Sequence, residues 1–214
     1  FERVLFPSVS RAARRAHRSL SVPAVQGCCG ALHAHNGELG AGLRMAERVG
    51  RRLPGLIVTT SGGCAAHLAD VLGSARIADI SQLLDPSRLQ PLTTDGRRLR
   101  VALQDSCHLR NGLGVWREPR ALLARIGDYV EVPGAESCCG SAGTYSLLRP
   151  TDSARLLEPK LDALEAARVD VVAAMNPGCL RQLRRGLRQR RSPVEAVHLV
   201  ELVARALHDL KEGS

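Results

Sequence analysis

Two short stretches, Gly27-Cys28-Cys29-Gly30 and Ser137-Cys138-Cys139-Gly140, decide how this chain is organised. The tripeptide Cys-Cys-Gly recurs after 110 positions, and a second Gly-Cys element follows each copy after an interval of 34 or 39 residues. These elements read Ser61-Gly62-Gly63-Cys64 and Asn176-Pro177-Gly178-Cys179. Self-similarity of this kind indicates a tandem duplication.

The duplication predicts two cysteine-rich halves, residues 1–90 and 91–214. Proline, threonine and glycine cluster between them, which predicts a linker at Asp85–Gly96. The first half holds three cysteines at positions 28, 29 and 64, and the second holds four at positions 107, 138, 139 and 179. An odd total of seven, in a chain that starts with Phe1, suggests a fragment boundary at that end.

Short β-branched runs alternate with amphipathic segments along the chain, which predicts an α/β fold. We expect strands at Val22–Val25, Leu56–Thr60, Leu99–Gln104, Tyr129–Val132, Val169–Met175 and Val194–His198. We expect helices at Ser10–Ser19, Glu38–Leu53, Cys64–Leu72, Pro119–Ile126, Asp152–Arg168, Cys179–Arg190 and Leu199–Leu210. Pro159 should break or kink the helix in which it lies, and Thr151 is a suitable N-cap for that helix.

The composition sets limits on the class of protein. The chain has 214 residues and 44% apolar residues, enough for a globular core, but only 2% aromatic residues, which argues against a nucleic-acid partner. No apolar run is long enough to cross a bilayer and no export signal is visible, so we expect a cytoplasmic protein. A peripheral position on the inner face of the cell membrane is the second option. The net charge of +9 is densest at 181–191, where a solvated helix face is the simplest interpretation and an acidic docking partner the alternative.

The cysteines point to a metal centre. In the cytosol thiols stay reduced, and packing does not explain adjacent cysteines, because neighbouring side chains of a strand point to opposite faces. Cys107, Cys138, Cys139 and Cys179 together offer four thiolates, a set that suits zinc or an iron–sulfur cluster. The sequence contains no Cys-x-x-Cys pair of the kind structural zinc favours. An iron–sulfur cluster is therefore preferred over zinc, and inert buried thiols are the third interpretation.

These elements closely resemble the paired cysteine-rich CCG domains of the glycolate oxidase iron–sulfur subunit family. The resemblance lies in Asp105-Ser106-Cys107-His108-Leu109, in 136–145 around the second vicinal pair, in Asn176-Pro177-Gly178-Cys179-Leu180 and in 27–35 around the first. Related CCG proteins are found in heterodisulfide reductase and in lactate utilisation. The CCG pattern itself ends in Cys-x-x-Cys, whereas here Ser61 and Asn176 occupy the first of those two positions.

The resemblance implies an electron-transfer subunit of a glycolate oxidase or dehydrogenase complex. In such a complex flavoprotein subunits carrying FAD oxidise glycolate to glyoxylate, and electrons pass through this subunit toward quinone. The sequence itself shows no flavin or nicotinamide signature, so the substrate-oxidising site is expected on a partner. The resemblance also implies an N-terminal ferredoxin-like module with two 4Fe–4S clusters, which is absent from this sequence.

The resemblance further implies that Cys107, Cys138, Cys139 and Cys179 bind a 4Fe–4S cluster, with Cys28, Cys29 and Cys64 as a less certain second site whose leading cysteine would precede Phe1. His33, His35, His108 and Asp105 lie near these elements and are candidates for tuning them. Two alternative functions remain. One is a heterodisulfide reductase-type or lactate-utilisation subunit with a noncubane cluster, and the other is a protein with a structural zinc site.

Overall fold

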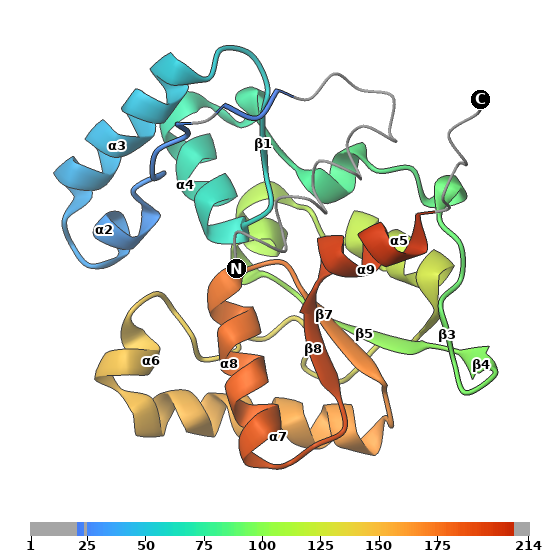
Figure 1. Ribbon diagram of the computed structural model, residues 1–214. Helices are drawn as coiled ribbons and strands as arrows, with labels where there is room; N and C mark the ends of the chain where they lie inside the picture. Colours follow the sequence, from blue (N-terminus) through green and yellow to red (C-terminus); the bar gives the residue numbers. More distant parts are fainter. Residues whose placement is uncertain (1–20, 24, 208–214) are drawn as a thin grey trace, which may run out of the picture.

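The computed structural model describes residues 21–23 and 25–207 (Figure 1). The helix predicted at Ser10–Ser19 lies outside the described residues. The strand predicted at Val22–Val25 is wrong, because its described residues have no regular structure. Among the described residues no helix is both long and apolar enough to span a membrane.

A four-stranded parallel sheet forms the centre of the second half, with the strands in the order β6-β5-β7-β8. The strands are β5 (Arg100–Gln104), β6 (Asp128–Tyr129), β7 (Val171–Ala174) and β8 (Glu195–His198). Four helices cover its two faces: α5 (Arg117–Ile126) and α9 (Leu199–Ala206) on one, α7 (Pro150–Ala166) and α8 (Pro177–Gln189) on the other (Figure 1). This three-layer arrangement confirms the predicted α/β class.

Burial on both faces explains why these strands are almost continuously apolar. Along β5, Val101 and Leu103 pack into the core shared with α5 and α9, whereas Ala102 packs toward α7 and α8. The same alternation continues in β7, where Val171 and Val172 belong to different cores. The sheet is therefore held from both sides by aliphatic side chains.

The first half repeats one unit of the second. Strand β1 (Ile57–Thr59) leads into α4 (Gly62–Leu72) and then into the parallel strand β2 (Ile77–Asp79), as β7 leads through α8 into β8. Helices α2 (Ala31–His35) and α3 (Leu39–Arg52) precede this unit. In both copies the last residue of the second strand caps the helix that follows: Asp79 caps η2 (Ile80–Leu83) and His198 caps α9. The predicted duplication is thus visible as two matching βαβ units.

The connection between the halves is ordered rather than a free linker. Segment 85–98 contains the 3₁₀-helix η3 (Pro86–Arg88) and a hairpin of β3 (Thr93–Thr94) with β4 (Arg97–Arg98). Leu89 is 1% exposed and pairs with Leu207. One core joins residues of both halves, Val49 and Leu68 of the first among them. The two halves therefore share an interior.

Several local predictions need correction. Helix α7 continues through Pro159, and it begins at Pro150 after Arg149 rather than with Thr151 as a side-chain cap. Three consecutive turns of α7 bury leucines in one core, and this packing offsets the hydrogen bond that proline removes. Strand β6 is two residues long and ends before the predicted Val132. The remaining short elements are η1 (Ser74–Arg76), the π-helical turn η4 (Leu109–Leu113) and α6 (Tyr145–Leu148).

Candidate functional site

Three cysteine elements follow neighbouring strands of the parallel sheet. Strand β5 ends at Gln104, shortly before Cys107, and β7 ends at Ala174, shortly before Cys179. The chain that leaves β6 reaches Cys138 and Cys139 after one loop. Carboxyl ends of parallel strands meet at one edge of a sheet, where α/β proteins bind their ligands. The topology accordingly gathers the four predicted thiols of the second half.

The four sulfurs influence one another's protonation in sequence, Cys107 with Cys138, Cys138 with Cys139, and Cys139 with Cys179. The Cys138 side chain, together with burial, raises the pKa of Cys107, and the side chains of Cys138 and Cys179, together with burial, raise the pKa of Cys139. The pKa values of the other two cysteines shift in the opposite direction. The neighbouring Cys107 and Cys139 hold the pKa of Cys138 far below the usual range, and Cys139 lowers the pKa of Cys179 against the effect of burial.

Helix α8 also contributes to this set. Cys179 is its third residue, so its sulfur lies where the free backbone N–H groups favour a negative charge. The amide Nδ2 of Asn176 lies 3.9 Å from the Cys179 sulfur, and the backbone N–H of Gly140 lies 3.4 Å from that of Cys138. Both groups donate to the sulfurs whose pKa values are lowered. The surroundings of Cys138 and Cys179 therefore suit thiolates.

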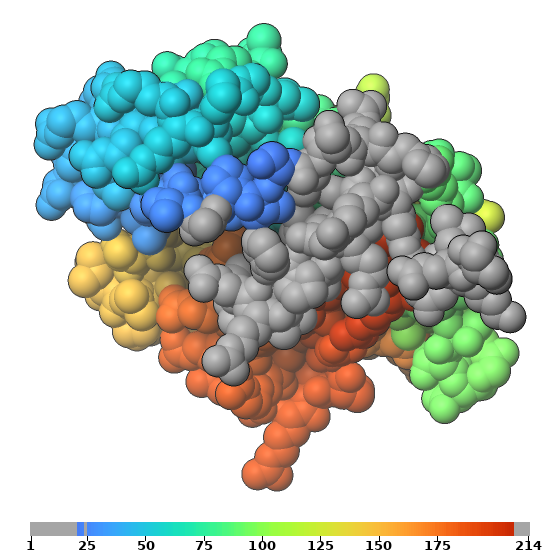
Figure 2. All heavy atoms as spheres, turned by 45° about the horizontal axis from the view of Figure 1, so that its top comes forward, coloured from blue at the N-terminus to red at the C-terminus, as the bar shows by residue number. Residues whose placement is uncertain are grey.

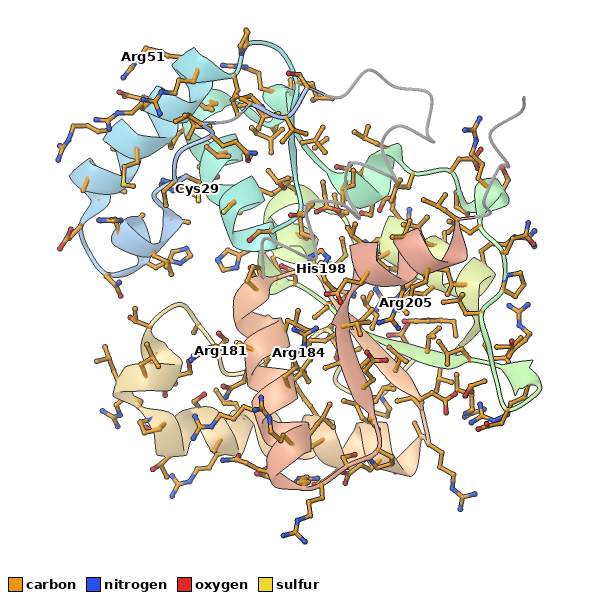
Figure 3. All side chains as sticks on the ribbon, viewed as in Figure 1. Cys29, Arg51, Arg181, Arg184, His198 and Arg205 are labelled. Atoms are coloured by element: carbon orange, nitrogen blue, oxygen red, sulfur yellow. The ribbon has the colours of Figure 1, made fainter. Side chains whose placement is uncertain are left out.

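In the first half Cys64 is correspondingly the third residue of α4. The Cys29 thiol donates to the Cys64 sulfur over 2.9 Å, which raises the pKa of Cys29 and lowers that of Cys64 to about 7. Cys28 is exposed and acts on Cys64 only through its charge. Figure 3 places Cys29 between α2 and α4. The structure thus pairs two of the three predicted cysteines of this half directly.

The two vicinal pairs have the same local geometry. Cys28 and Cys138 are exposed, whereas Cys29 and Cys139 are buried. The glycine that follows has a positive φ in both, 84° at Gly30 and 80° at Gly140. A Cβ at either glycine would lie 2.5 Å from a carbonyl oxygen of the adjacent helix. Only glycine meets both demands, which explains the third residue of the Cys-Cys-Gly motif.

The turns that carry Cys64 and Cys179 lie against each other. Ser61 Oγ donates to Asn176 Oδ1 over 3.1 Å, and the Gly62 N–H donates to the Met175 carbonyl over 3.2 Å. Ser61 and Asn176 are the residues that stand where the family pattern has cysteine. Instead of supplying sulfur, they form a hydrogen bond between the halves.

A second contact between the halves lies beside the vicinal pairs. The rings of His35 and His108 stack with centroids 5.0 Å apart, and Thr144 Oγ1 donates to Asn36 Oδ1 over 2.6 Å. In Figure 2 the gold region around α6 lies directly beneath the blue segment that contains α2 and α3. His108 Nδ1 is 3.6 Å from the Cys107 sulfur, and burial lowers its pKa. Of the predicted tuning histidines, His108 is therefore the one that the structure brings to a thiol.

Buried polar groups hold the loops that carry the second set. Asp105 is 4% exposed and accepts hydrogen bonds from Arg110 and Arg120. Gln104 Nε2 donates to carbonyl oxygens of the loop before Cys138, and Lys160 Nζ donates to the carbonyl of Gly134 in the same loop. Sequence reasoning selected Asp105 but missed Gln104 and Lys160. Lys160 could have been noticed because nearly all other basic residues of this chain are arginine.

The four thiols of the second half can now be compared with the two groups that the sequence suggested, a zinc ion and an iron–sulfur cluster. Within residues 21–23 and 25–207, no group of three or more His, Cys, Asp or Glu side chains is arranged to hold a single metal ion. Four thiolates, in contrast, are the ligand set of a cluster with several irons. The residues present therefore fit an iron–sulfur group by their chemistry.

Comparisons with known proteins agree with this interpretation of the motifs. A family model described as "CCG: Cysteine-rich domain" matches residues 6–69 and 101–184. A "Probable glycolate oxidase iron-sulfur subunit" of Bacillus subtilis is 34% identical over 209 residues, covering 86% of this chain and 47% of that protein. A subunit of the CoM/CoB fumarate reductase of Methanothermobacter marburgensis is 30% identical, covering 89% of this chain and 40% of that protein.

A more partial match is "Lactate utilization protein A 2" of Bacillus cereus, 27% identical over 51% of this chain and 46% of that protein. The resemblance seen in the cysteine motifs is confirmed by these matches. The chain spans about half the length of the curated relatives it matches.

Proposed function

Because this chain belongs to the cysteine-rich CCG domain family, we propose that it is an iron–sulfur electron-transfer subunit of an oxidoreductase complex. Its cluster ligands would be Cys107, Cys138, Cys139 and Cys179, and the cluster would be of the 4Fe–4S type. The observation that carries this proposal is the set of four thiols that act on one another at one edge of the parallel sheet. No other group of side chains in the described part of the chain combines so many redox-capable ligands.

A bound cluster would supply one-electron transfer at this position. The protein's own residues prepare the ligands for it. The N-terminus of α8 and the Asn176 amide stabilise negative charge on Cys179, and the Gly140 N–H does the same for Cys138. Cys139 and Cys179 are buried, so water is excluded from that side of the site.

Cys28, Cys29 and Cys64 would form the second site. Cys29 and Cys64 already contact each other, and Cys64 lies at a helix N-terminus as Cys179 does. The hydrogen bond between Ser61 and Asn176 joins the turns that carry the two sites. If both are occupied, this arrangement lets electrons pass between the halves over a short path.

We propose glycolate as the substrate of the complex, because the relative from Bacillus subtilis is named for glycolate oxidase. A partner flavoprotein carrying FAD would oxidise glycolate, and quinone would accept the electrons. The second candidate is a heterodisulfide reductase-type or lactate-utilisation subunit with a noncubane cluster, which the names of the other two relatives favour. As a glycolate oxidase subunit this chain would conduct electrons from a cytoplasmic partner and would need no substrate site of its own. As a heterodisulfide reductase-type subunit it would carry out thiol or disulfide chemistry at its own cluster.

The test is anaerobic reconstitution with iron and sulfide. We expect a brown protein that contains about four irons per occupied site and gives an electron paramagnetic resonance signal in one redox state. Cys139→Ser should remove or alter the signal of the second half, and Cys29→Ser, its counterpart in the first half, should leave that signal in place. A colourless protein with stoichiometric zinc, or a Cys139→Ser protein with an unchanged spectrum, would contradict the ligand assignment. Reduction by a glycolate-oxidising flavoprotein but not by a lactate-oxidising one would test the substrate.

A further inference from the structure

Lys160 is a buried basic residue that the proposed ligand set does not use. It lies in the middle of α7 and is 6% exposed, beside the buried Leu157, Leu161 and Leu164 of the same helix. These leucines pack in one core with Cys139 and Cys179. Lys160 Nζ donates to the Gly134 carbonyl over 2.5 Å. The ammonium is thus held inside the layer that carries the buried sulfurs.

Among the described residues no carboxylate forms an ion pair with this ammonium. The Glu136 carboxylate acts on it electrostatically, but Glu136 is exposed. Burying an unpaired positive charge is costly, so a buried ammonium needs an anionic partner. The other groups that act on Lys160 through their charge are Cys138, Cys139 and Cys179.

Lysine is a rare residue in this chain. Of 30 basic residues only Lys160 and Lys211 are lysine, which leaves 28 arginines. Beside Lys160, Gln104 and Gly134 is a cavity of about 10 Å³, about the space of one water. An ammonium is a compact point charge, whereas a guanidinium is broad and planar, so Lys160→Arg would keep the charge with a different shape.

We propose that Lys160 is the charge partner of the cysteine thiolates of the second half and that its ammonium raises the reduction potential of the group they bind. This inference rests on the proposed function. One electron taken from an external reductant makes the site more negative by one charge, with no proton or bond change required. A fixed positive charge in a low-dielectric interior stabilises that reduced form more than the oxidised form.

The experiment compares reduction potentials of the reconstituted protein during titration with dithionite, followed by electron paramagnetic resonance. Lys160→Gln removes the charge and keeps a hydrogen-bond donor. The matched control is Arg155→Gln, which removes a positive charge from the same helix at a side chain that is 78% exposed. We expect Lys160→Gln to change the reduction equilibrium at least tenfold toward the oxidised form, about 59 mV for one electron. Arg155→Gln should leave it within measurement error, because solvent screens its charge.

The outcomes separate this inference from the proposed function. A wild-type protein that takes up no iron would overturn the function itself. A wild-type protein that loads normally while Lys160→Gln keeps its potential, or shifts no more than Arg155→Gln, would overturn the role of Lys160. If Lys160→Gln folds, as judged by circular dichroism, but takes up no iron, the iron uptake of Lys160→Arg is measured next. Iron uptake by the arginine variant supports a requirement for positive charge at this position, and the absence of iron uptake in both variants refutes it.

Discussion

Replacing Asp105 with asparagine should destabilise the protein strongly. The carboxylate is 4% exposed and receives three short hydrogen bonds from two guanidinium groups, at 2.7 Å from Arg110 and at 2.8 and 3.1 Å from Arg120. Removing one partner of a buried ion pair costs about 3–5 kcal/mol, because the remaining charge stays buried. Arg120 keeps a second partner in Glu131, so we expect the lower end, about 3 kcal/mol.

Urea unfolding of the metal-free protein, followed by circular dichroism, measures this loss as a lower midpoint at unchanged slope. In a chain of this size about 3 kcal/mol corresponds to a fall of about 6–12 °C in Tm. Asp128→Asn is the matched control, since Asp128 binds one arginine, Arg98, and its side chain is 55% exposed. That variant should lose at most about 1 kcal/mol. Equal losses in the two variants would refute the reasoning from burial.

Three further predictions concern backbone and buried groups. Gly140→Ala should lower the free energy of unfolding in urea by at least about 2 kcal/mol, because φ is 80° and the new Cβ would clash with the Ser153 carbonyl. The control Gly55→Ala, with φ of 82° and open space around the new Cβ, should lower it by about 1 kcal/mol. Similar losses in the two variants would disprove the clash. Burial raises the pKa of Asp79 to about 6, so its contribution to stability is full below pH 3.8 and is lost as the pH rises through 6. Asp79→Asn should therefore stabilise the protein at pH 7, by up to about 3 kcal/mol, and a loss there would contradict this. Burial lowers the pKa of His198, whose Nε2 donates to the Thr60 carbonyl. The contribution of His198 to the free energy of unfolding is therefore present above pH 6.5 and is lost as the pH falls through the folded-state pKa. The wild type should be less stable at pH 5 than at pH 7.5, and His198→Asn should not show this difference.

The long strands and helices were predictable because their patterns are strong. β1, β5, β7 and β8 lie within the predicted runs, since buried parallel strands are β-branched and apolar on both faces. The hairpin of β3 and β4 was misread as a linker. Its turn residues, Asp95 and Gly96, both have positive φ, and Asp-Gly between short polar runs is itself a hairpin signal. β2 was missed because Ile77–Asp79 is too short to show alternation.

The site was predictable in its residue types and less so in its surroundings. Repetition of Cys-Cys-Gly predicted the two cysteine-rich halves and the set of four thiols in the second, and the assignment of the four cysteines as cluster ligands stays a prediction. The bond between Ser61 and Asn176 spans 115 positions, and no local pattern announces such a contact. Lys160 lies on a helix face that reads as ordinary amphipathic sequence.

The core shared by the two halves has a consequence for how the chain folds during synthesis. Val49 and Leu68 of the first half complete the same core as Leu202 and Val203 near the end of α9. A ribosome makes the first half well before those partners emerge, so this core cannot close over α3 and α4 until α9 has been translated. The first vicinal cysteines therefore lie in a segment that reaches its final packing only after the second half has been made. Cluster insertion into the first half would follow the translation of α9 rather than precede it.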